Sequence, residues 1–366
     1  MTSPLPRWVE IGLIPLINLT LAFLVAGVVV ALIGEDPVRA MTVMINGAFV
    51  YPGSLGYTLY YTTNFIFTGL AVAVAFHAML FNIGGEGQAT LGGLGVALVC
   101  LWLDPYLPGI VVIPVAILGA ALFGAAWAFV PGWLQAYRGS HIVITTIMFN
   151  FIAAGVLVAL LSGVMMSSGQ GSPQTRAFAD TATMPRFDEM AAWFGIKIAR
   201  SPLNISFVLA LLACVGVWIL IWRTKFGYAV RALGHSEPAA VYAGIPVKRM
   251  VVIIMAISGA LAGLMAVNEI LGAQEKLVLN FSGGYGFTGI AVALMGRNHP
   301  IGIVLASLLF GALWQGGAEL DFEFDSIRRE MVLVIQGLII LFSGALAYMF
   351  TPWLARLFLA RRSTDG

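Results

Sequence analysis

The sequence predicts an all-α polytopic membrane protein with about ten transmembrane helices, some of them short or interrupted, and with both termini in the cytoplasm. Hydrophobic residues make up 60% of the 366 positions and charged residues only 10%. Soluble domains, in contrast, carry roughly 25% charged residues. Since backbone groups in lipid must hydrogen-bond within the chain, helices are the expected spans. The net charge of +2, without a long basic run, does not point to a nucleic-acid partner.

The apolar runs define the predicted spans in order. The first run is too long for the apolar part of a signal peptide, so it is interpreted as an uncleaved first helix. The other runs are separated by polar or glycine-rich segments, and two of them are short. The predicted spans are 11–33, 57–80, 87–103, 109–133, 142–164, 204–222, 250–271, 284–296, 301–319 and 331–351, and they form one membrane domain, 1–366.

Lys and Arg residues set the predicted orientation. The segment 223–249 carries Arg223, Lys225, Arg231, Lys248 and Arg249, which places it in the cytoplasm together with both termini. The segments 34–56, 165–203, 272–283 and 320–330 then lie outside. The segment 165–203 is longer than an ordinary loop, and a short helix is expected near 188–195. This outer segment is either a plain connector or a docking surface.

One polar stretch interrupts the apolar sequence at 81–88, which reads FNIGGEGQ. Three glycines weaken a helix there, while Asn82, Glu86 and Gln88 can hydrogen-bond the freed backbone or a solute. An ionisable residue at membrane depth by default indicates a functional site. The alternative is that Glu86 lies at the inner interface, or caps the helix that begins there.

A second interruption lies at 280–300, which reads NFSGGYGFTGIAVALMGRNHP. Glycines precede an apolar run that is too short to span by itself, a pattern typical of transporter helices that line a substrate path. Short helices packed on their neighbours would give the same pattern. Asn150, in the fifth predicted span, could likewise line a cavity or hydrogen-bond a neighbouring helix.

The predicted cytoplasmic loop has its own local signals. Phe226–Leu233 is expected to form a short helix that Gly234 ends. Ser236 is a plausible N-cap for a second short helix, with Glu237 and Pro238 in its first turn. Gly244 can cap that helix and Pro246 stops it. Small alanines on its surface would let another protein come close, although a simple connector would look the same.

This loop resembles the cytoplasmic coupling segment of permease subunits in ATP-binding cassette (ABC) importers. Their pattern resembles R-A-x-G-x-N-x-x-A-A-x-x-x-G-I, and Ser236 departs from it where Asn is usual, although both residues can cap a helix. FNIGGEGQ is similar to the N-I-G-x-E-G-Q signature of the branch that imports nucleosides and simple sugars, and GGYGFTGIAVALMGRNHPIG is similar to its later signature. The resemblance covers about 57–345 and, with the N-terminal extension, is greatest to a nucleoside permease. The matching loop positions are Arg231, Ala232, Gly234, Glu237, Ala239, Ala240, Gly244 and Ile245.

The resemblance implies a permease subunit that binds no cofactor itself. ATP and Mg²⁺ would act on a partner ATPase, whose two nucleotide-binding modules are often fused in this branch. A second, different permease chain and an extracytoplasmic solute-binding protein complete the implied assembly in the bacterial cytoplasmic membrane. A ribose-like sugar permease is the alternative within the family. The implied substrate-path residues are Asn82, Glu86, Gln88, Asn150, Phe281 and Tyr285, and the implied coupling residues are Arg231, Gly234, Glu237, Ala239, Ala240, Gly244 and Ile245.

No catalytic or metal-binding constellation stands out in the residues themselves. None of the four lysines lies in a phosphate-binding loop, and the four histidines lack metal-ligand spacing. Cys100 and Cys214 both lie in apolar runs and are expected to be buried. The rival readings are an ion-coupled secondary transporter, in which Glu86 and Glu269 would be the coupling acids, and a protein with an assembly role.

Overall fold

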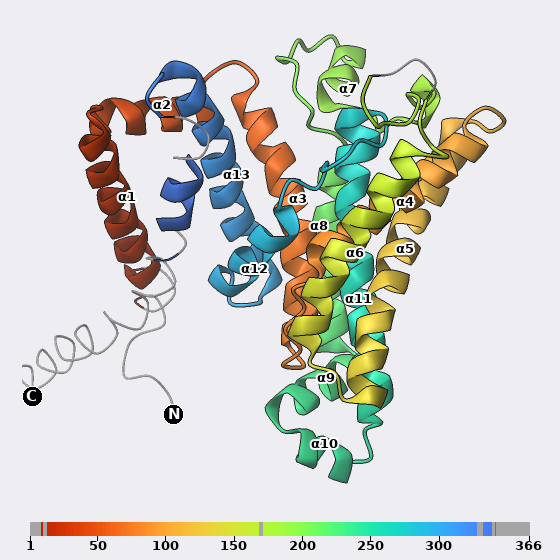
Figure 1. Cartoon of the computed structure of the whole chain (residues 1–366). Helices are drawn as coiled ribbons and strands as arrows, with labels where there is room; N and C mark the ends of the chain where they lie inside the picture. The colour runs from red at the N-terminus through yellow and green to blue at the C-terminus, as the bar shows by residue number, and fades with distance from the viewer. Residues whose placement is uncertain (1–8, 10–12, 168–170, 328–331, 339–340, 342–366) are drawn as a thin grey trace, which may run out of the picture. The chain divides into compact units, whose positions relative to one another are not determined.

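The computed structural model describes residues 13–167, 171–327 and 332–338, together with Val9 and Leu341. This described part is helical, with two isolated β-bridges and no strand, which confirms the all-α prediction (Figure 1). The α-helices are α1 (Ile14–Ile33), α2 (Pro37–Phe49), α3 (Ser54–Phe76), α4 (Gly85–Leu103), α5 (Gly109–Arg138), α6 (Ile142–Ser162), α7 (Phe187–Trp193), α8 (Ser206–Arg223), α9 (Lys225–His235), α10 (Glu237–Tyr242), α11 (Val247–Ala266), α12 (Tyr285–Met295) and α13 (Pro300–Glu323).

Seven of these helices are long and apolar enough to cross a membrane. The number rises to eight if Leu19–Ile33 and Pro37–Phe49, which are bent by 119°, count as one span. Helix α12 is apolar but shorter, as the sequence predicts for 284–296. The predicted span 331–351 lies largely outside the described residues. The count of ten, the single-domain organisation and the side of the termini therefore stay predictions.

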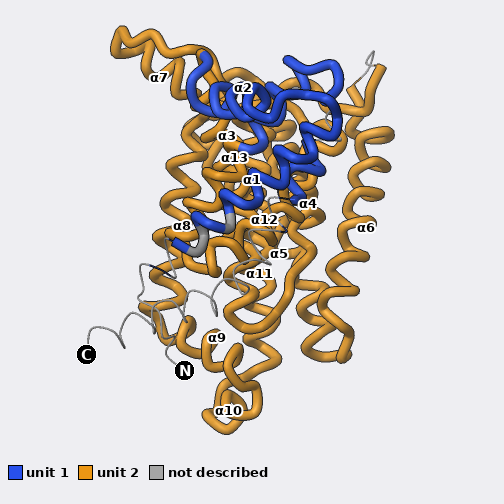
Figure 2. The backbone as a smooth tube through the Cα atoms, turned by 90° about the vertical axis from the view of Figure 1, so that its left-hand side faces the viewer, with its two compact units in different colours: residues 1–51, 313–366 blue, residues 52–312 orange. Residues whose placement is uncertain are grey.

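The chain divides into two compact units (Figure 2). Unit 1 consists of residues 1–51 and 313–366, and unit 2 of residues 52–312. Within unit 1, α2 packs closely on the end of α13, because a Cβ on Gly47 would lie 2.3 Å from Cγ of Glu319. Helix α2 was not foreseen in the segment 34–56, although Asp36 caps it by accepting from the amide of Val38 (2.8 Å).

Unit 2 is centred on α11, which packs against α4 and α5 through glycines. A Cβ on Gly259 would lie 2.3 Å from the carbonyl oxygen of Gly124, and one on Gly92 would lie 2.5 Å from Cα of Gly263. Small residues at such crossings let helix backbones approach closely. After Ala266 the helix continues as a π-helical turn, Val267–Gln274, which runs past the end of the predicted span 250–271.

The outer segment of unit 2 contains the short helix expected near 188–195, observed as α7. Helix α7 lies at one end of the unit and α9 and α10 lie at the other (Figure 1). Part of the segment contacts the C-terminal end of α4 and the residues that follow the π-helical turn. The amide of Thr175 donates to the carbonyl of Leu277 (3.0 Å), and Arg176 forms an ion pair with Asp104 (2.6 Å).

Asp104 lies one residue beyond α4 and has an almost fully buried side chain. Burial opposes its ionisation, but hydrogen bonds from Arg176 and from the amide of Ala179 outweigh that effect and hold its pKa below the ordinary value. The ion pair therefore attaches the outer segment to the α4–α5 turn.

Candidate functional site

The residues of FNIGGEGQ lie where the chain breaks between α3 and α4, within unit 2. Asn82 and Gln88 exchange two amide hydrogen bonds, with Asn82 Nδ2 donating to Gln88 Oε1 (2.9 Å) and Gln88 Nε2 donating to Asn82 Oδ1 (3.0 Å). Asn82 also donates to the hydroxyl of Ser258 on α11 (2.8 Å) and accepts from the amide of Gly84 (2.9 Å). Both side chains are buried, so they hold an irregular backbone in the helix bundle.

Asn150 of α6 holds the same break from the other side. Its Oδ1 accepts from the amide of Gly87 (2.9 Å), and its Nδ2 donates to the carbonyl of Ile83 (2.9 Å). The side chain thus satisfies two backbone groups that the break leaves without helical partners. This is the interhelical hydrogen bond that the sequence offered as one of two alternatives.

Glu86 lies in the first turn of α4 and reaches the N-terminus of α12. Its two carboxylate oxygens accept from the amides of Gly284 (2.9 Å) and Gly286 (2.8 Å), and Ser282 also hydrogen-bonds to it. A helix N-terminus carries partial positive charge, and here one carboxylate lies at two of them. Glu86 lies in the first turn of its own helix, but the hydrogen bonds of its carboxylate go to the start of a helix that begins 199 residues later.

The two helix starts approach so closely that only glycine fits at position 286. A Cβ on Gly286 would lie 2.2 Å from the amide nitrogen of Glu86, whereas one on Gly85 would make an ordinary contact of 3.4 Å with the carbonyl oxygen of Gly286. Gly284 takes a left-handed conformation, with φ of +86°, immediately before α12. We call this meeting of residues 82–88 with 282–286 the α4–α12 junction.

The two aromatic candidates pack beside this junction. The ring of Phe281 lies over Gly93 of α4, where an added Cβ would be 2.3 Å from its Cζ atom. Tyr285 meets Phe65 of α3 edge-on, with ring centroids 5.5 Å apart, and lies 6.4 Å from the ring of Tyr61. Both candidates are buried, so packing, which the sequence allowed for short helices, accounts for their positions.

A second buried polar cluster joins α3, the residues just before α8 and the π-helical turn after α11. Glu269 accepts from Nδ2 of Asn64 (2.6 Å) and hydrogen-bonds to the side chain of Tyr60. Asn268 donates to Asn64 Oδ1 (2.8 Å) and accepts from Asn204 Nδ2 (2.9 Å). Sequence reasoning singled out only Glu269 here. An Asn next to a Glu within an apolar run was the signal that could have indicated its neighbour Asn268.

The predicted coupling segment forms two short helices. Ser236 caps α10 as predicted, because its side chain accepts from the amide of Ala239, and Gly244 follows α10 in the left-handed conformation (φ +77°). The prediction for Gly234 was wrong, since α9 continues to His235. Gly234 is instead a contact point, because an added Cβ would lie 2.1 Å from the carbonyl oxygen of His77 at the end of α3.

The coupling segment also has an inner and an outer face. Arg231 points inward and donates to the carbonyl of Ile221 on α8 (2.6 Å), while Ala240 is 1% exposed. Glu237, Ala239 and Gly244 are exposed and Ile245 is half-buried. Tyr242 is the most prominent side chain of α10, with 97% of its surface exposed.

Next to α9, three aromatic rings pack together where three helices begin or end. Trp222 of α8 lies 5.1 Å from His77 after α3 and 5.1 Å from His299, which precedes α13. Because Gly234 of α9 contacts the backbone of His77, a displacement of α9 would push against this group of rings. The rings thus connect the coupling segment to the turn that follows α12.

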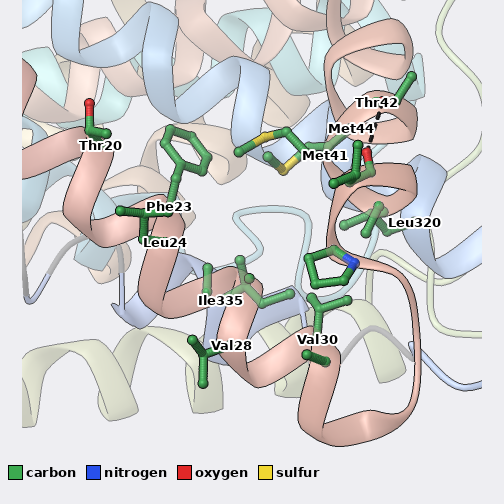
Figure 3. Close-up of a pocket in the computed structure, with 16 residues that line it drawn as sticks. Thr20, Phe23, Leu24, Val28, Val30, Met41, Thr42, Met44, Leu320 and Ile335 are labelled. Carbon is green, nitrogen blue, oxygen red and sulfur yellow. Dashed lines mark hydrogen bonds between the residues drawn. The ribbon is translucent and has the colours of Figure 1, made fainter.

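Unit 1 contains a separate apolar pocket of about 660 Å³, with an open mouth, between the two arms of the bent α1–α2 pair (Figure 3). Its two hydroxyl groups, on Thr20 and Thr42, donate to the carbonyls of Leu16 and Val38 in their own helices (2.8 Å each). None of the sequence-predicted site residues lines it. A pocket with this lining suits hydrocarbon and offers little to a polar solute.

Among the described residues, no group of three or more His, Cys, Asp or Glu side chains could hold a metal ion. Cys100 and Cys214 are both buried and free. The described residues of unit 2 offer a glycine-packed junction inside the bundle and two short helices, α9 and α10, at one end.

Comparison with known proteins places the chain among transport subunits. Residues 54–344 match the family described as branched-chain amino acid transport system / permease component. The chain is 34% identical to a guanosine ABC transporter permease of Bacillus subtilis over 90% of this chain and 92% of that protein. It is 33% identical to a nucleoside ABC transporter permease of Lactococcus lactis (90% of each), and 32% identical to a glucose ABC transporter permease of Haloferax volcanii (92% and 88%).

Proposed function

Since this chain belongs to the family of ABC importer permease components, in its nucleoside and sugar branch, we propose that it forms part of the membrane path of a nucleoside. The observation that best supports this proposal is that a sequence motif of the branch and two similar proteins point to the same substrate class. The FNIGGEGQ stretch forms the α4–α12 junction, and two relatives that are more than 30% identical are named for nucleosides.

Energy for transport would come from a partner. The exposed face of α10, with Glu237, Ala239 and Tyr242, is where an ATPase subunit would grip the permease. Motion of α9 would then press Gly234 against His77 and reach the α12–α13 turn through Trp222 and His299. ATP and Mg²⁺ would be bound by the ATPase, and helices α9 and α10 of this chain would transmit its motion.

The path itself would open and close at the α4–α12 junction. Half-length helices with an N-terminus inside the membrane are typical of transporter sites. Here the N-terminus of α12 is occupied by Glu86, whose two hydrogen bonds would hold the junction closed until α4 and α12 separate. Asn82, Gln88 and Asn150 would shape the path by fixing the break, and Phe281 and Tyr285 would line it if the junction opens.

The proposed setting is the bacterial cytoplasmic membrane, with both termini and α10 on the cytoplasmic side. A second, different permease chain, an ATPase with two fused nucleotide-binding modules and an extracytoplasmic solute-binding protein would complete the importer. The segment 165–203 would face the binding protein or the outer surface of the cytoplasmic membrane.

A sugar is the second candidate substrate, because the glucose permease is almost as similar to this chain as the nucleoside permeases. We rank the nucleoside first because two of these three relatives are named for a nucleoside. This ranking does not affect the permease assignment.

The decisive experiment is uptake into proteoliposomes that hold the four proposed components. We expect ATP-dependent uptake of a labelled nucleoside that an unlabelled nucleoside abolishes and excess glucose does not. The inverse competition would replace the nucleoside with a sugar. Uptake without ATP, driven by a proton or sodium gradient and lost in Glu269→Gln, would contradict the ABC mechanism.

A further inference from the structure

The outer segment of unit 2 contains a loop whose base is closed by backbone hydrogen bonds. The amide of Phe187 donates to the carbonyl of Leu203 (2.9 Å), and the amide of Ile205 donates to the carbonyl of Pro185 (3.2 Å). These bonds flank a bridge between Arg186 and Asn204. Residues 187–203 therefore form a compact loop with joined ends, of the kind that carries binding surfaces.

The tip of this loop exposes large apolar side chains. Trp193 is 75% exposed, Phe194 81%, Ile196 57% and Ile198 55%, and no residue of α7 is buried. Four such side chains within six positions are more than the scattered apolar residues of an ordinary surface. A contiguous apolar patch of this type marks a surface that something else covers.

The charges around the tip are basic. Lys197 and Arg200 lie beside the apolar side chains and are exposed, and residues 190–203 include no Asp or Glu. The two acidic residues of α7, Asp188 and Glu189, form ion pairs with Arg186 at the base of the loop. The tip thus offers aromatic rings and cations together, a composition typical of segments that lie in the headgroup region of a bilayer.

The position of the loop agrees with that composition. Arg176, in the same outer segment, is paired with Asp104 in the α4–α5 turn, where Trp102 (75%) and Tyr106 (83%) are also exposed. Exposed Trp and Tyr residues at helix ends mark the level of the membrane–water interface. Helix α7 extends sideways beyond the other helices of unit 2 (Figure 2), so its tip is placed beside the bundle.

We propose that residues 193–200 are a membrane-surface anchor. Trp193, Phe194, Ile196 and Ile198 enter the outer headgroup region, and Lys197 and Arg200 bind lipid phosphates. A binding protein that departs after each delivery would leave the patch in water for part of every cycle, whereas lipid covers it throughout. The anchor fixes the start of α3, because Gly53 and Gly56 there pack against Arg200 and Ser201.

The test uses the assembled complex in lipid vesicles, with Phe194→Cys carrying an environment-sensitive fluorophore. The native thiols do not compete for the label, because Cys100 and Cys214 are buried. The expected result is blue-shifted emission, loss of quenching by iodide, and quenching by lipids that carry a spin label about 5–10 Å into the headgroup and acyl boundary. The matched control is Tyr242→Cys at the opposite end, measured without the ATPase subunit that would otherwise cover α10, and iodide should quench it freely.

Two further observations can overturn the anchor. Protection from iodide that begins only when the solute-binding protein is added would assign the patch to that protein. Protection with crosslinking of position 194 to the second permease, but without quenching by lipid, would assign it to the subunit interface. In contrast, Lys197→Glu combined with Arg200→Glu should reduce lipid quenching, and more so in vesicles containing phosphatidylglycerol than in pure phosphatidylcholine.

Discussion

The coupling segment and the α4–α12 junction are both rich in glycine, yet they are built in different ways. The coupling segment is stabilised largely by local contacts, such as the hydrogen bond from the amide of Ala239 to Ser236 three residues earlier. The junction joins residues about 200 positions apart, through Glu86 and the amides of Gly284 and Gly286.

The difference determines what each glycine does. Gly244 supplies a left-handed conformation that ends a helix, and nothing lies within 4 Å of its added Cβ. Gly286 has an ordinary helical place but lies against the backbone of another helix. Composition alone does not separate a turn glycine from a contact glycine, because both are the same residue in a short motif.

The largest expected effect comes from Gly286→Ala. The added Cβ would lie 2.2 Å from the amide nitrogen of Glu86, so α4 and α12 would have to separate. We expect a marked fall in thermal stability and the loss of nearly all transport, measured by thermal unfolding of the purified complex and by vesicle uptake. The matched control is Gly155→Ala in α6, where nothing lies within 4 Å and the change should be neutral or stabilise by about 0.5–1 kcal/mol. Wild-type stability in Gly286→Ala would show that the junction is loosely packed.

Substitution of Glu86 should have the next largest effect. Glu86→Gln keeps one acceptor oxygen and leaves the amide of Gly284 or Gly286 without a partner, at a cost of about 1–3 kcal/mol. Glu86→Ala removes both acceptors and should cost more. Unfolding and uptake would be measured for both variants, with Asp321→Asn, an exposed acid of α13, as the control. Equal stability of all the variants would mean that glycine packing alone holds the junction.

In the coupling segment, the effect of a substitution should depend on whether the residue lies on the exposed or the buried face of α10. Glu237→Arg changes an exposed side chain, so stability should be unchanged while transport per ATP hydrolysed falls several-fold. Ala240→Asp places a carboxylate at a buried position and should cost about 1–3 kcal/mol, weakening the whole segment. The ratio of uptake to ATPase activity, together with thermal unfolding, separates the two variants. If both simply uncoupled transport, the inner and outer faces of α10 would be equivalent.

The smallest expected effect is that of Asp104→Asn, which removes a long-range ion pair outside the junction. Arg176 remains partly hydrated, so we expect a loss of only about 1 kcal/mol near neutral pH. The pKa of Asp104 is below its ordinary value of 3.8, so its stabilising contribution is present above that pH and is lost as the pH falls through the folded value. Unfolding temperatures of wild type and variant should converge in acid. A difference that persists there would mean that the ion pair is not what the substitution removes.

Much of the fold could be predicted because the bilayer imposes simple rules on sequence. Apolar runs predicted most of the helices with ends within a few residues, for example 87–103 against Gly85–Leu103. Helix α2 was missed because the Asp36-Pro37 start signal lies in a segment that orientation alone had assigned to the outside. The π-helical turn at Val267–Gln274 has no sequence rule that separates it from continued α-helix.

The sequence by itself determined the class of protein, the existence of two membrane-embedded breaks, and the local form of α10, because hydropathy and caps act over a few residues. Only the tertiary structure decided that Glu86 reaches α12, that Gly234 and Gly286 are contact points, and that Asn64 and Asn204 join Glu269 and Asn268 in one buried cluster. Each of these depends on which helices become neighbours. That choice is set by packing across the whole bundle, and no short window of sequence contains it.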